Sequence, residues 1–241
     1  MKDIRVIAFD ADDTLWVNEP YFREAEERFC ELVKDYMPQE EANQELFKTE
    51  INNLPLYGYG VKGFTLSMIE AIMNITDNKG SLHLVEGALA IGREILGKPV
   101  VLLENVEETL KSLNGDYRLV MATKGDLLDQ ERKLLKSGLA KHFHHIEIMS
   151  NKNKEDFQKL INHLDCAPHE FLMVGNSLKS DILPVLHAGG TAVHVPYHIT
   201  WEHEKIDHLV EHDNFHHVDT IKDILPLLKG QSYLKNGSYK G

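Results

Sequence analysis

The chain has 241 residues, 42% of them hydrophobic, and its 26 Lys and Arg against 38 Asp and Glu give a formal net charge of −12 at pH 7. This length can bury a sizeable core, in one large domain or in a core with a second, smaller domain. The negative charge argues against nucleic acids and anionic membrane surfaces as partners. A phosphorylated small molecule can still bind if a metal and local cations offset the negative charge of the protein.

Two features of the sequence bear on where the protein works. Its cysteines, Cys30 and Cys166, stand far apart, and the chain opens on a strand-like segment without a charged and then apolar leader. No apolar stretch approaches the roughly 18 residues of a membrane span. We therefore expect a cytoplasmic protein that does not enter membranes, and we make no prediction about its oligomeric state.

The first predicted element is a buried strand at residues 4–9, which ends directly before Asp10 and Asp12. A run as apolar as residues 4–9 is typical of a central parallel strand that is covered on both faces. Ligands bind beyond the carboxyl ends of such strands. Two close carboxylates repel each other, so a fold keeps them when a cation neutralises them or when one performs acid/base chemistry. An Asp-rich turn in solvent is the alternative.

Residues 19–97 show helical periodicity, which predicts a helical insertion after the first strand. Within it, residues 54–63 contain three glycines and a proline and are predicted to form a loop. Tyr57, Tyr59 and Lys62 could meet a ligand from this loop, or the two aromatic rings could simply pack.

Short apolar runs alternate with helical stretches in the rest of the chain, the rhythm of a doubly wound α/β fold with a parallel sheet. The predicted strands are residues 117–122, 146–149, 171–174 and 192–195, and the predicted helices are 104–114, 126–137, 155–164 and 178–188. We expect an α/β core domain of residues 1–16 and 98–230, a helical cap domain of residues 17–97, and a flexible tail at 231–241.

Polar side chains follow three of these strands, and the carboxyl ends of parallel strands share one edge of the sheet. They are Thr123 with Lys124, then Lys152 and Lys154, then the turn Gly175-Asn176-Ser177-Leu178-Lys179-Ser180-Asp181. A hydroxyl and turn N–H groups could hold phosphate oxygens, and a lysine could supply a fixed positive charge. Taken singly, each has an ordinary explanation: turn chemistry, a solvated lysine, or an acidic residue at a helix start.

The ordered set is more specific than its members. Asp-x-Asp-x-Thr after the first strand, then Thr, then Lys, then Gly-Asn-Ser-x-x-x-Asp resembles the haloacid dehalogenase superfamily of hydrolases over nearly all of residues 1–230. The helical insertion resembles the type 1 cap of that superfamily. The resemblance implies a Rossmann-like core with a cap domain inserted after its first strand.

The resemblance also implies roles for individual residues. Asp10 would be the nucleophile and Asp12 the general acid/base, while Thr123 and Lys124 would hold the phosphoryl group. Lys152, which Phe157 follows five positions later, fits the pattern of the superfamily's lysine better than Lys154 does.

The implied cofactor is Mg²⁺, held by the Asp10 carboxylate, the Asp12 backbone carbonyl and the acidic motif at Asp181. The chain departs from the superfamily at Asn176, where aspartate is more common. Because an amide is neutral, Asn176 would bind Mg²⁺ less strongly and leave Asp181 as the second charged ligand.

Asp12 favours phosphatases and phosphomutases within the superfamily, because dehalogenases lack an acid/base aspartate there. Hydrolysis is favoured since the insertion shows no extra cationic cluster for a second phosphate. We therefore expect a Mg²⁺-dependent phosphomonoester hydrolase that acts on a small cytosolic phosphorylated metabolite through an aspartyl-phosphate. The alternatives are a phosphomutase, a non-catalytic protein that binds a phosphorylated ligand, and a receiver-like signalling module, which would be about half this length.

Overall fold

The computed structural model of the protein describes residues 1 and 3–230, so the predicted tail at 231–241 lies outside the described residues. The described chain forms two compact units. The first comprises Met1–Val17, Val100–Thr123 and the described residues from Lys133 onward, and the second comprises Asn18–Pro99 and Lys124–Arg132. Among the described helices, none combines the length and apolar character needed to cross a membrane.

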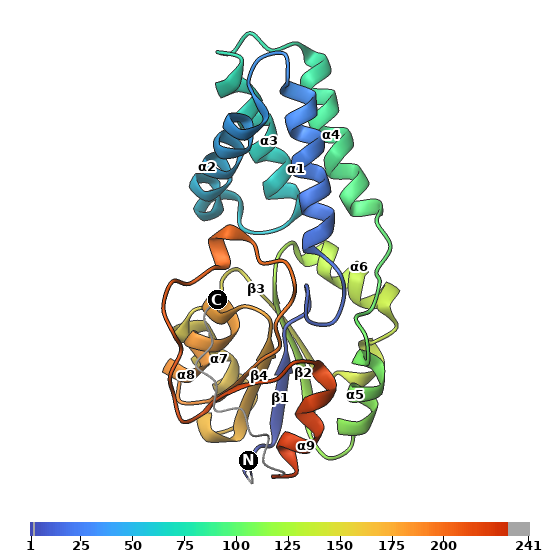
Figure 1. The fold of residues 1–241 in the computed structure, drawn as a ribbon. Coiled ribbons are helices and arrows are strands. Elements are labelled where there is room, and N and C mark those ends of the chain that lie inside the picture. Colours follow the sequence, from blue (N-terminus) through green and yellow to red (C-terminus); the bar gives the residue numbers. More distant parts are fainter. Residues whose placement is uncertain (2, 231–241) are drawn as a thin grey trace. The chain divides into compact units, whose positions relative to one another are not determined.

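The first unit is built on a sheet with helices on both faces (Figure 1). The strand order is β3-β2-β1-β4-β5-β6, and the pairings of β1 with β2 and β4, of β4 with β5, and of β5 with β6 are parallel. The strands are β1 (Val6–Phe9), β2 (Arg118–Lys124), β3 (His145–Met149), β4 (Phe171–Gly175), β5 (Thr191–His194) and β6 (Phe215–His217). The predicted doubly wound α/β fold is confirmed, with β6 as an additional short strand.

The two faces of β1 belong to different hydrophobic layers because successive side chains of a strand point in opposite directions. Ile7 and Phe9 pack in the layer that includes α5 (Val106–Leu113) and α9 (Ile224–Leu228). Val6 and Ala8 pack in the layer of α7 (Lys154–His163) and α8 (Leu183–His187). With both faces covered, the edge beyond Phe9 is the natural place for a ligand to reach this strand.

The order of the strands places a topological switch point at β1. The chain runs from β1 through β2 to β3 on one side, and then returns to lay β4, β5 and β6 on the other side. The connections that follow β1 and β4 therefore lead away from each other and leave a crevice at the carboxyl ends of the strands, where ligands bind in open α/β sheets.

The second unit consists largely of helices packed around their own apolar core, to which Phe29, Leu46, Phe64 and Ile91 belong. Its long helices are α1 (Glu19–Val33), α2 (Gln39–Tyr57), α3 (Val61–Ile75) and α4 (Leu82–Gly97). The first turns of α6 (Leu127–Ser137) are grouped with this unit, while the rest of that helix belongs to the first unit.

The predicted loop at residues 54–63 is wrong over most of its length. Helix α2 continues to Tyr57 and α3 begins at Val61, so only Gly58–Gly60 interrupts the helices. Pro55 has no N–H to donate to the preceding turn, yet α2 continues for two residues beyond it, and the Gly58 N–H closes the last turn on the carbonyl of Leu54 at 3.0 Å.

An acidic cluster lies inside the second unit. Arg23 on α1 pairs with Glu19 at 3.1 Å and with Glu26 at 3.0 Å. Burial raises the pKa of Glu50 on α2 to about 8, the charges of Glu26 and Glu19 add to this shift, and Arg23 opposes it. The folded protein therefore keeps a proton on Glu50 that the unfolded chain gives up above its ordinary pKa near 4.5.

This proton makes the stability of the protein dependent on pH. From about pH 4.5 to 8 the unfolded chain binds fewer protons than the folded one, so the free energy of unfolding falls as the pH rises. We expect Glu50→Gln to be more stable than the wild type at pH 8 by roughly 4 kcal/mol, with the difference vanishing toward pH 4.5. Urea denaturation at both pH values measures this, with exposed Glu41→Gln as the control. Equal gains in the two variants would contradict the prediction.

Candidate active site

Asp10 lies at the switch point, one residue beyond β1. Its N–H donates to the carbonyl of Val174 on β4 at 2.9 Å, which continues the parallel pairing by one residue. The chain then turns sharply: Ala11 accepts the N–H of Leu15 at 2.8 Å, and Asp13 adopts a φ of 61°, a conformation that Asp tolerates better than most residues. The predicted acidic turn therefore exists, and it holds Asp10 at the edge of the sheet.

Lys152 lies between two carboxylates. Its Nζ donates to Asp10 Oδ1 at 2.5 Å and to Asp181 Oδ1 at 2.7 Å, and its side chain is 1% exposed. Burial alone would lower the pKa of Lys152, but the charges of Asp10 and Asp181 raise it above its ordinary value. The exposed Lys154, by contrast, begins α7 two residues later.

The surroundings of Asp10 favour its protonated form. Its pKa is raised to about 7, with burial as the largest cause, the charge of Lys152 opposing the shift, and the carboxylates of Asp181 and Asp12 adding to it. One lysine thus faces two buried carboxylates, and a further cation beside them would favour the ionised form of Asp10.

The turn after β4 brings Asp181 and Asn176 to the same place. Asp181 Oδ2 accepts the N–H of Ser177 at 3.0 Å, across a wide π-helical turn at Leu178–Ile182. A Cβ atom on Gly175 would lie 2.2 Å from Asp181 Oδ2, so the turn requires glycine there. Thr14 accepts the Asn176 N–H at 3.1 Å, and its hydroxyl lies 3.1 Å from Asp10 Oδ2 and 3.2 Å from Asn176 Oδ1.

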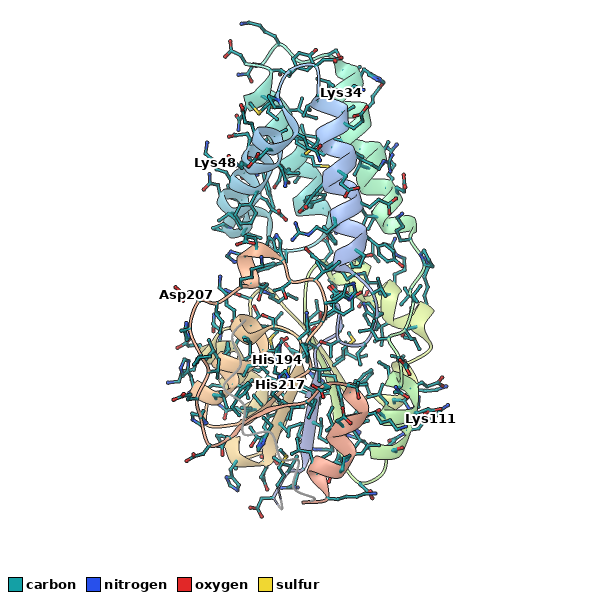
Figure 2. All side chains as sticks on the ribbon, viewed as in Figure 1. Lys34, Lys48, Lys111, His194, Asp207 and His217 are labelled. Carbon is teal, nitrogen blue, oxygen red and sulfur yellow. The ribbon has the colours of Figure 1, made fainter. Side chains whose placement is uncertain are left out.

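A pair of histidines supports this turn from β5 and β6 (Figure 2). His194 Nε2 lies 3.0 Å from the Asn176 carbonyl, and its Nδ1 lies 3.1 Å from His217 Nδ1. Burial lowers the pKa of His194 to about 4, so its ring is neutral near pH 7. Because a carbonyl only accepts, His194 donates from Nε2 and accepts at Nδ1, and the proton between the rings belongs to His217.

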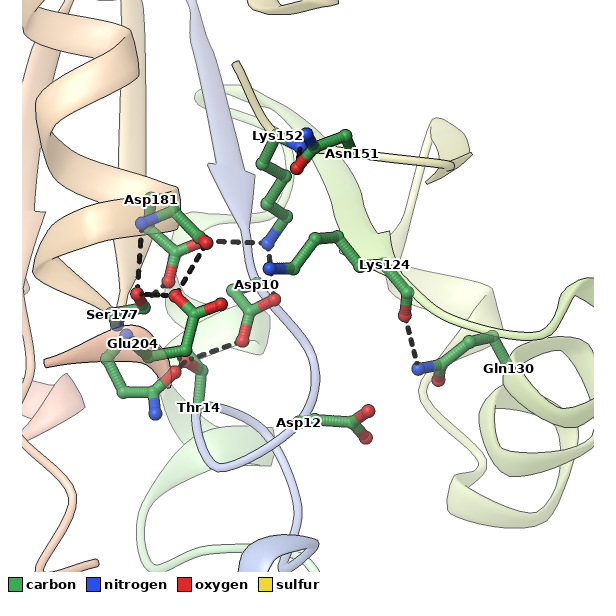
Figure 3. Close-up of polar contacts among 12 residues, drawn as sticks. Asp10, Asp12, Thr14, Lys124, Gln130, Asn151, Lys152, Ser177, Asp181 and Glu204 are labelled. Atoms are coloured by element: carbon green, nitrogen blue, oxygen red, sulfur yellow. Dashed lines mark hydrogen bonds and ion pairs between the residues drawn. The ribbon is translucent and has the colours of Figure 1, made fainter. Parts of the chain in front are cut away.

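Asp12 points away from Asp10 (Figure 3) and has partners of its own. Its Oδ1 accepts Trp16 Nε1–H at 2.7 Å and a hydrogen bond from Lys133 Nζ at 2.8 Å. The two acidic side chains of the motif therefore occupy separate environments, as a nucleophile and an acid/base group require.

Of the remaining predicted residues, one belongs to the first unit and four to the second. Thr123 is buried at the end of β2, whereas Lys124, Tyr57, Tyr59 and Lys62 belong to the second unit. Within that unit, Lys124 Nζ lies 4.0 Å from the centre of the Tyr59 ring. Lys62 pairs with Asp126 at 2.8 Å, and the Tyr57 hydroxyl donates to Glu70 at 2.6 Å.

The residues beyond β1 and β4 fit a hard divalent cation. Asp10, Asp181 and Asn176 supply carboxylate and amide oxygens, which are ligands that Mg²⁺ prefers. Within the described part of the chain, no three His, Cys, Asp or Glu side chains are grouped so that they could hold a metal on their own. A site here would therefore also need the amide, backbone or solvent oxygens.

The comparison with known families agrees with this arrangement. Residues 4–189 match the model of the haloacid dehalogenase-like hydrolases. The protein therefore belongs to this family of hydrolases, as its motifs predict. A haloacid dehalogenase-like family hydrolase from Xanthomonas campestris, of known crystal structure, is 33% identical, with a TM-score of 0.84 over 95% of this chain and 94% of the other.

Two further relatives differ in their named activities. A glyceraldehyde 3-phosphate phosphatase from Methanothermobacter thermautotrophicus is 27% identical over 209 residues, which cover 82% of this chain and 88% of that protein. A 2-haloacid dehalogenase from Pseudomonas syringae pv. tomato is 16% identical, with a TM-score of 0.65 over 95% of this chain and all of the other (100%). The second likeness concerns the fold alone, so the choice of reaction depends on the site.

Several residues of the cluster receive no role from the sequence. Thr14 is part of the first motif, and that position is the signal that could have identified its hydroxyl as a member of the cluster. Lys133 and Glu204 come from segments with no motif of their own, and Ser177 lies in a turn where Asn176 and Asp181 stand out more. Only the folded chain brings Lys133 to Asp12 and Glu204 to Ser177.

Replacing the buried lysine tests the charge arrangement without reference to any activity. Lys152→Met leaves Asp10 and Asp181 facing each other without their cation, which typically costs about 3–5 kcal/mol of stability. We expect this loss in urea denaturation at pH 8 with EDTA present. The exposed Lys154→Met should change stability by less than about 0.5 kcal/mol. Similar values for the two variants would mean that Lys152 does not hold the carboxylates together.

Proposed function

We propose that the protein is a Mg²⁺-dependent phosphomonoester hydrolase that acts on a small cytosolic phosphorylated metabolite through an aspartyl-phosphate on Asp10. The observation that carries the proposal is the separation of the two acidic groups. Asp10 is held by Lys152 at the switch point, whereas Asp12 is held by Trp16 and Lys133. A nucleophile and a proton donor are thus available within one turn of the chain.

In the first step, a carboxylate oxygen of Asp10 bonds to phosphorus while the bond from phosphorus to the leaving oxygen breaks. Asp12 gives its proton to that leaving oxygen, a contribution typically worth about 10²–10⁴-fold. Lys152 stays protonated throughout and offsets the charge of Asp10 as the phosphate approaches. Thr123 and Lys124 would bind the phosphoryl oxygens.

In the second step, a water molecule attacks phosphorus and gives its proton to Asp12. The bond between phosphorus and Asp10 breaks, which releases inorganic phosphate and restores both side chains. Dividing one displacement into two lets Asp12 act first as an acid and then as a base. Trp16 and Lys133 keep its carboxylate in one orientation for both transfers.

Mg²⁺ would be held by Asp10, the backbone carbonyl of Asp12, Asp181 and Asn176. When bound, it supplies the positive charge that a phosphate dianion needs beside a carboxylate nucleophile. The rest of the charge balance comes from the chain, through Lys152.

The named activity of the archaeal relative supports a small phosphorylated substrate. Glyceraldehyde 3-phosphate is accordingly the first metabolite to test. A phosphomutase remains the second candidate, and it would exchange phosphate between positions of one substrate with little release of inorganic phosphate.

Phosphate release tests the proposal directly. With p-nitrophenyl phosphate and Mg²⁺ we expect steady release of inorganic phosphate, which EDTA abolishes and excess Mg²⁺ restores. Asp10→Asn, which removes the nucleophile and keeps its shape, should lower the rate by about 10³-fold or more. Release that persists in Asp10→Asn would contradict the covalent mechanism, and binding of a phosphate ester without turnover would favour a binding protein.

We further propose that the proposed cap domain, residues 17–97, selects the part of the substrate beyond its phosphoryl group. Tyr57, Tyr59 and Lys62 are the candidate contacts. The contacts within the second unit favour Tyr59 and Lys62 over Tyr57. Lys124 contacts the Tyr59 ring, and Asp126 pairs with Lys62, so residues 124–126 hold both side chains in place.

Substitution of Tyr59 separates selection from catalysis. We expect Tyr59→Ala to raise KM for the metabolite about 5–30-fold, since a lost aromatic contact of about 1–2 kcal/mol has that effect. The kcat for p-nitrophenyl phosphate should change little. Tyr36→Ala, at an exposed tyrosine of the same unit, is the matched control. Unchanged KM in Tyr59→Ala and in Lys62→Ala would remove both residues from substrate binding.

A further inference from the structure

The neutral side chain of Asn176 leaves the proposed cation site short of negative charge. Asp10 and Asp181 share Lys152, and Asp12 is paired with Lys133. Among the proposed cation ligands, the carboxylates of Asp10 and Asp181 against the ammonium of Lys152 leave one negative charge, which does not balance a divalent cation. Another anionic group at this edge would complete the balance.

Glu204 is attached to the turn that carries both Asn176 and Asp181. Its Oε2 accepts the Ser177 hydroxyl at 2.5 Å and the Ser180 hydroxyl at 2.6 Å. Ser177 follows Asn176 in the chain, and Ser180 precedes Asp181, so Glu204 contacts the neighbour of each proposed cation ligand.

The backbone next to Glu204 is hydrogen-bonded to the same turn. Glu204 ends a short 3-10 helix, Glu202–Glu204, in the connection between β5 and β6. The Lys179 ammonium donates to the carbonyl of His203 at 2.6 Å. In Figure 3 the Glu204 carboxylate is drawn beside Ser177, on the side of the cluster where Asp10 and Asp181 lie.

We propose that Glu204 supplies to the cation site the negative charge that the amide of Asn176 lacks. The inference rests on the proposed function, since it assumes the Mg²⁺ site at Asp10 and Asp181. With Glu204 included, its carboxylate and those of Asp10 and Asp181 against the ammonium of Lys152 leave two negative charges, which one Mg²⁺ neutralises. A carboxylate that acts beside the direct ligands typically changes metal affinity by about 10–100-fold.

The charge of Glu204 can be removed while its shape is kept. In Glu204→Gln the amide oxygen can still accept from Ser177 and Ser180, so the turn is retained. Isothermal titration with Mg²⁺ should show a Kd about 10–100-fold weaker than that of the wild type. Glu202→Gln, at an exposed residue of the same 3-10 helix that pairs with Lys205, should leave the Kd unchanged. Melting temperatures in EDTA check that both variants are folded.

Two further variants separate charge from structure. Asn176→Asp in the Glu204→Gln background returns one carboxylate to the turn and should restore the Kd to within about threefold of the wild type. Ser180→Ala removes a hydrogen bond to Glu204 but keeps its charge, and should weaken binding by less than about threefold.

The outcomes are distinct. Equal Kd values for wild type and Glu204→Gln would overturn the inference while leaving the Mg²⁺ site intact. A weakened Kd that Asn176→Asp does not restore would also overturn it and make Glu204 a residue that only holds the turn. A wild-type protein that does not bind Mg²⁺ would overturn the proposed function itself.

Discussion

The buried contact of Lys152 with Asp10 and Asp181 is the interaction on which the site depends. It joins the ends of β1 and β4 to the segment after β3, three parts of the chain that are far apart in sequence. Removing charges from water is costly, and the fold accepts this cost only because each carboxylate finds a cation or hydrogen-bond donors. The parallel sheet makes the contact possible, since it presents all its carboxyl ends at one edge.

The sequence predicts most of this edge because the signals are local. An apolar run followed by Asp10 and Asp12, and a glycine turn followed by Asp181, each lie within a few residues. The sequence alone leaves Lys152 and Lys154 as alternatives, and the fold separates them, since one is buried against Asp10 and the other begins α7 in solvent. The sequence does not predict the contacts of Lys133 and Glu204, because their partners are distant in the chain.

The second unit shows that proline and glycine do not always mark the end of a helix. Pro55 and the nearby glycines indicate a break, yet α2 continues past Pro55 to Tyr57 and α3 begins at Val61. Strand β6 is missed for a different reason. Its three residues include two histidines, and only its pairing with β5 makes it a strand.

Gly175 has a consequence for how this protein can diverge. Its missing side chain makes room for the carboxylate of Asp181, but also for the Asp181 Cβ, which would lie 2.6 Å from a Cβ at position 175. The backbone of the turn therefore demands glycine whatever chemistry residue 181 performs. A descendant that had lost its activity would still keep this glycine, because the fold of the turn requires it. The glycine therefore marks the fold of such a lineage and does not show whether a member is active.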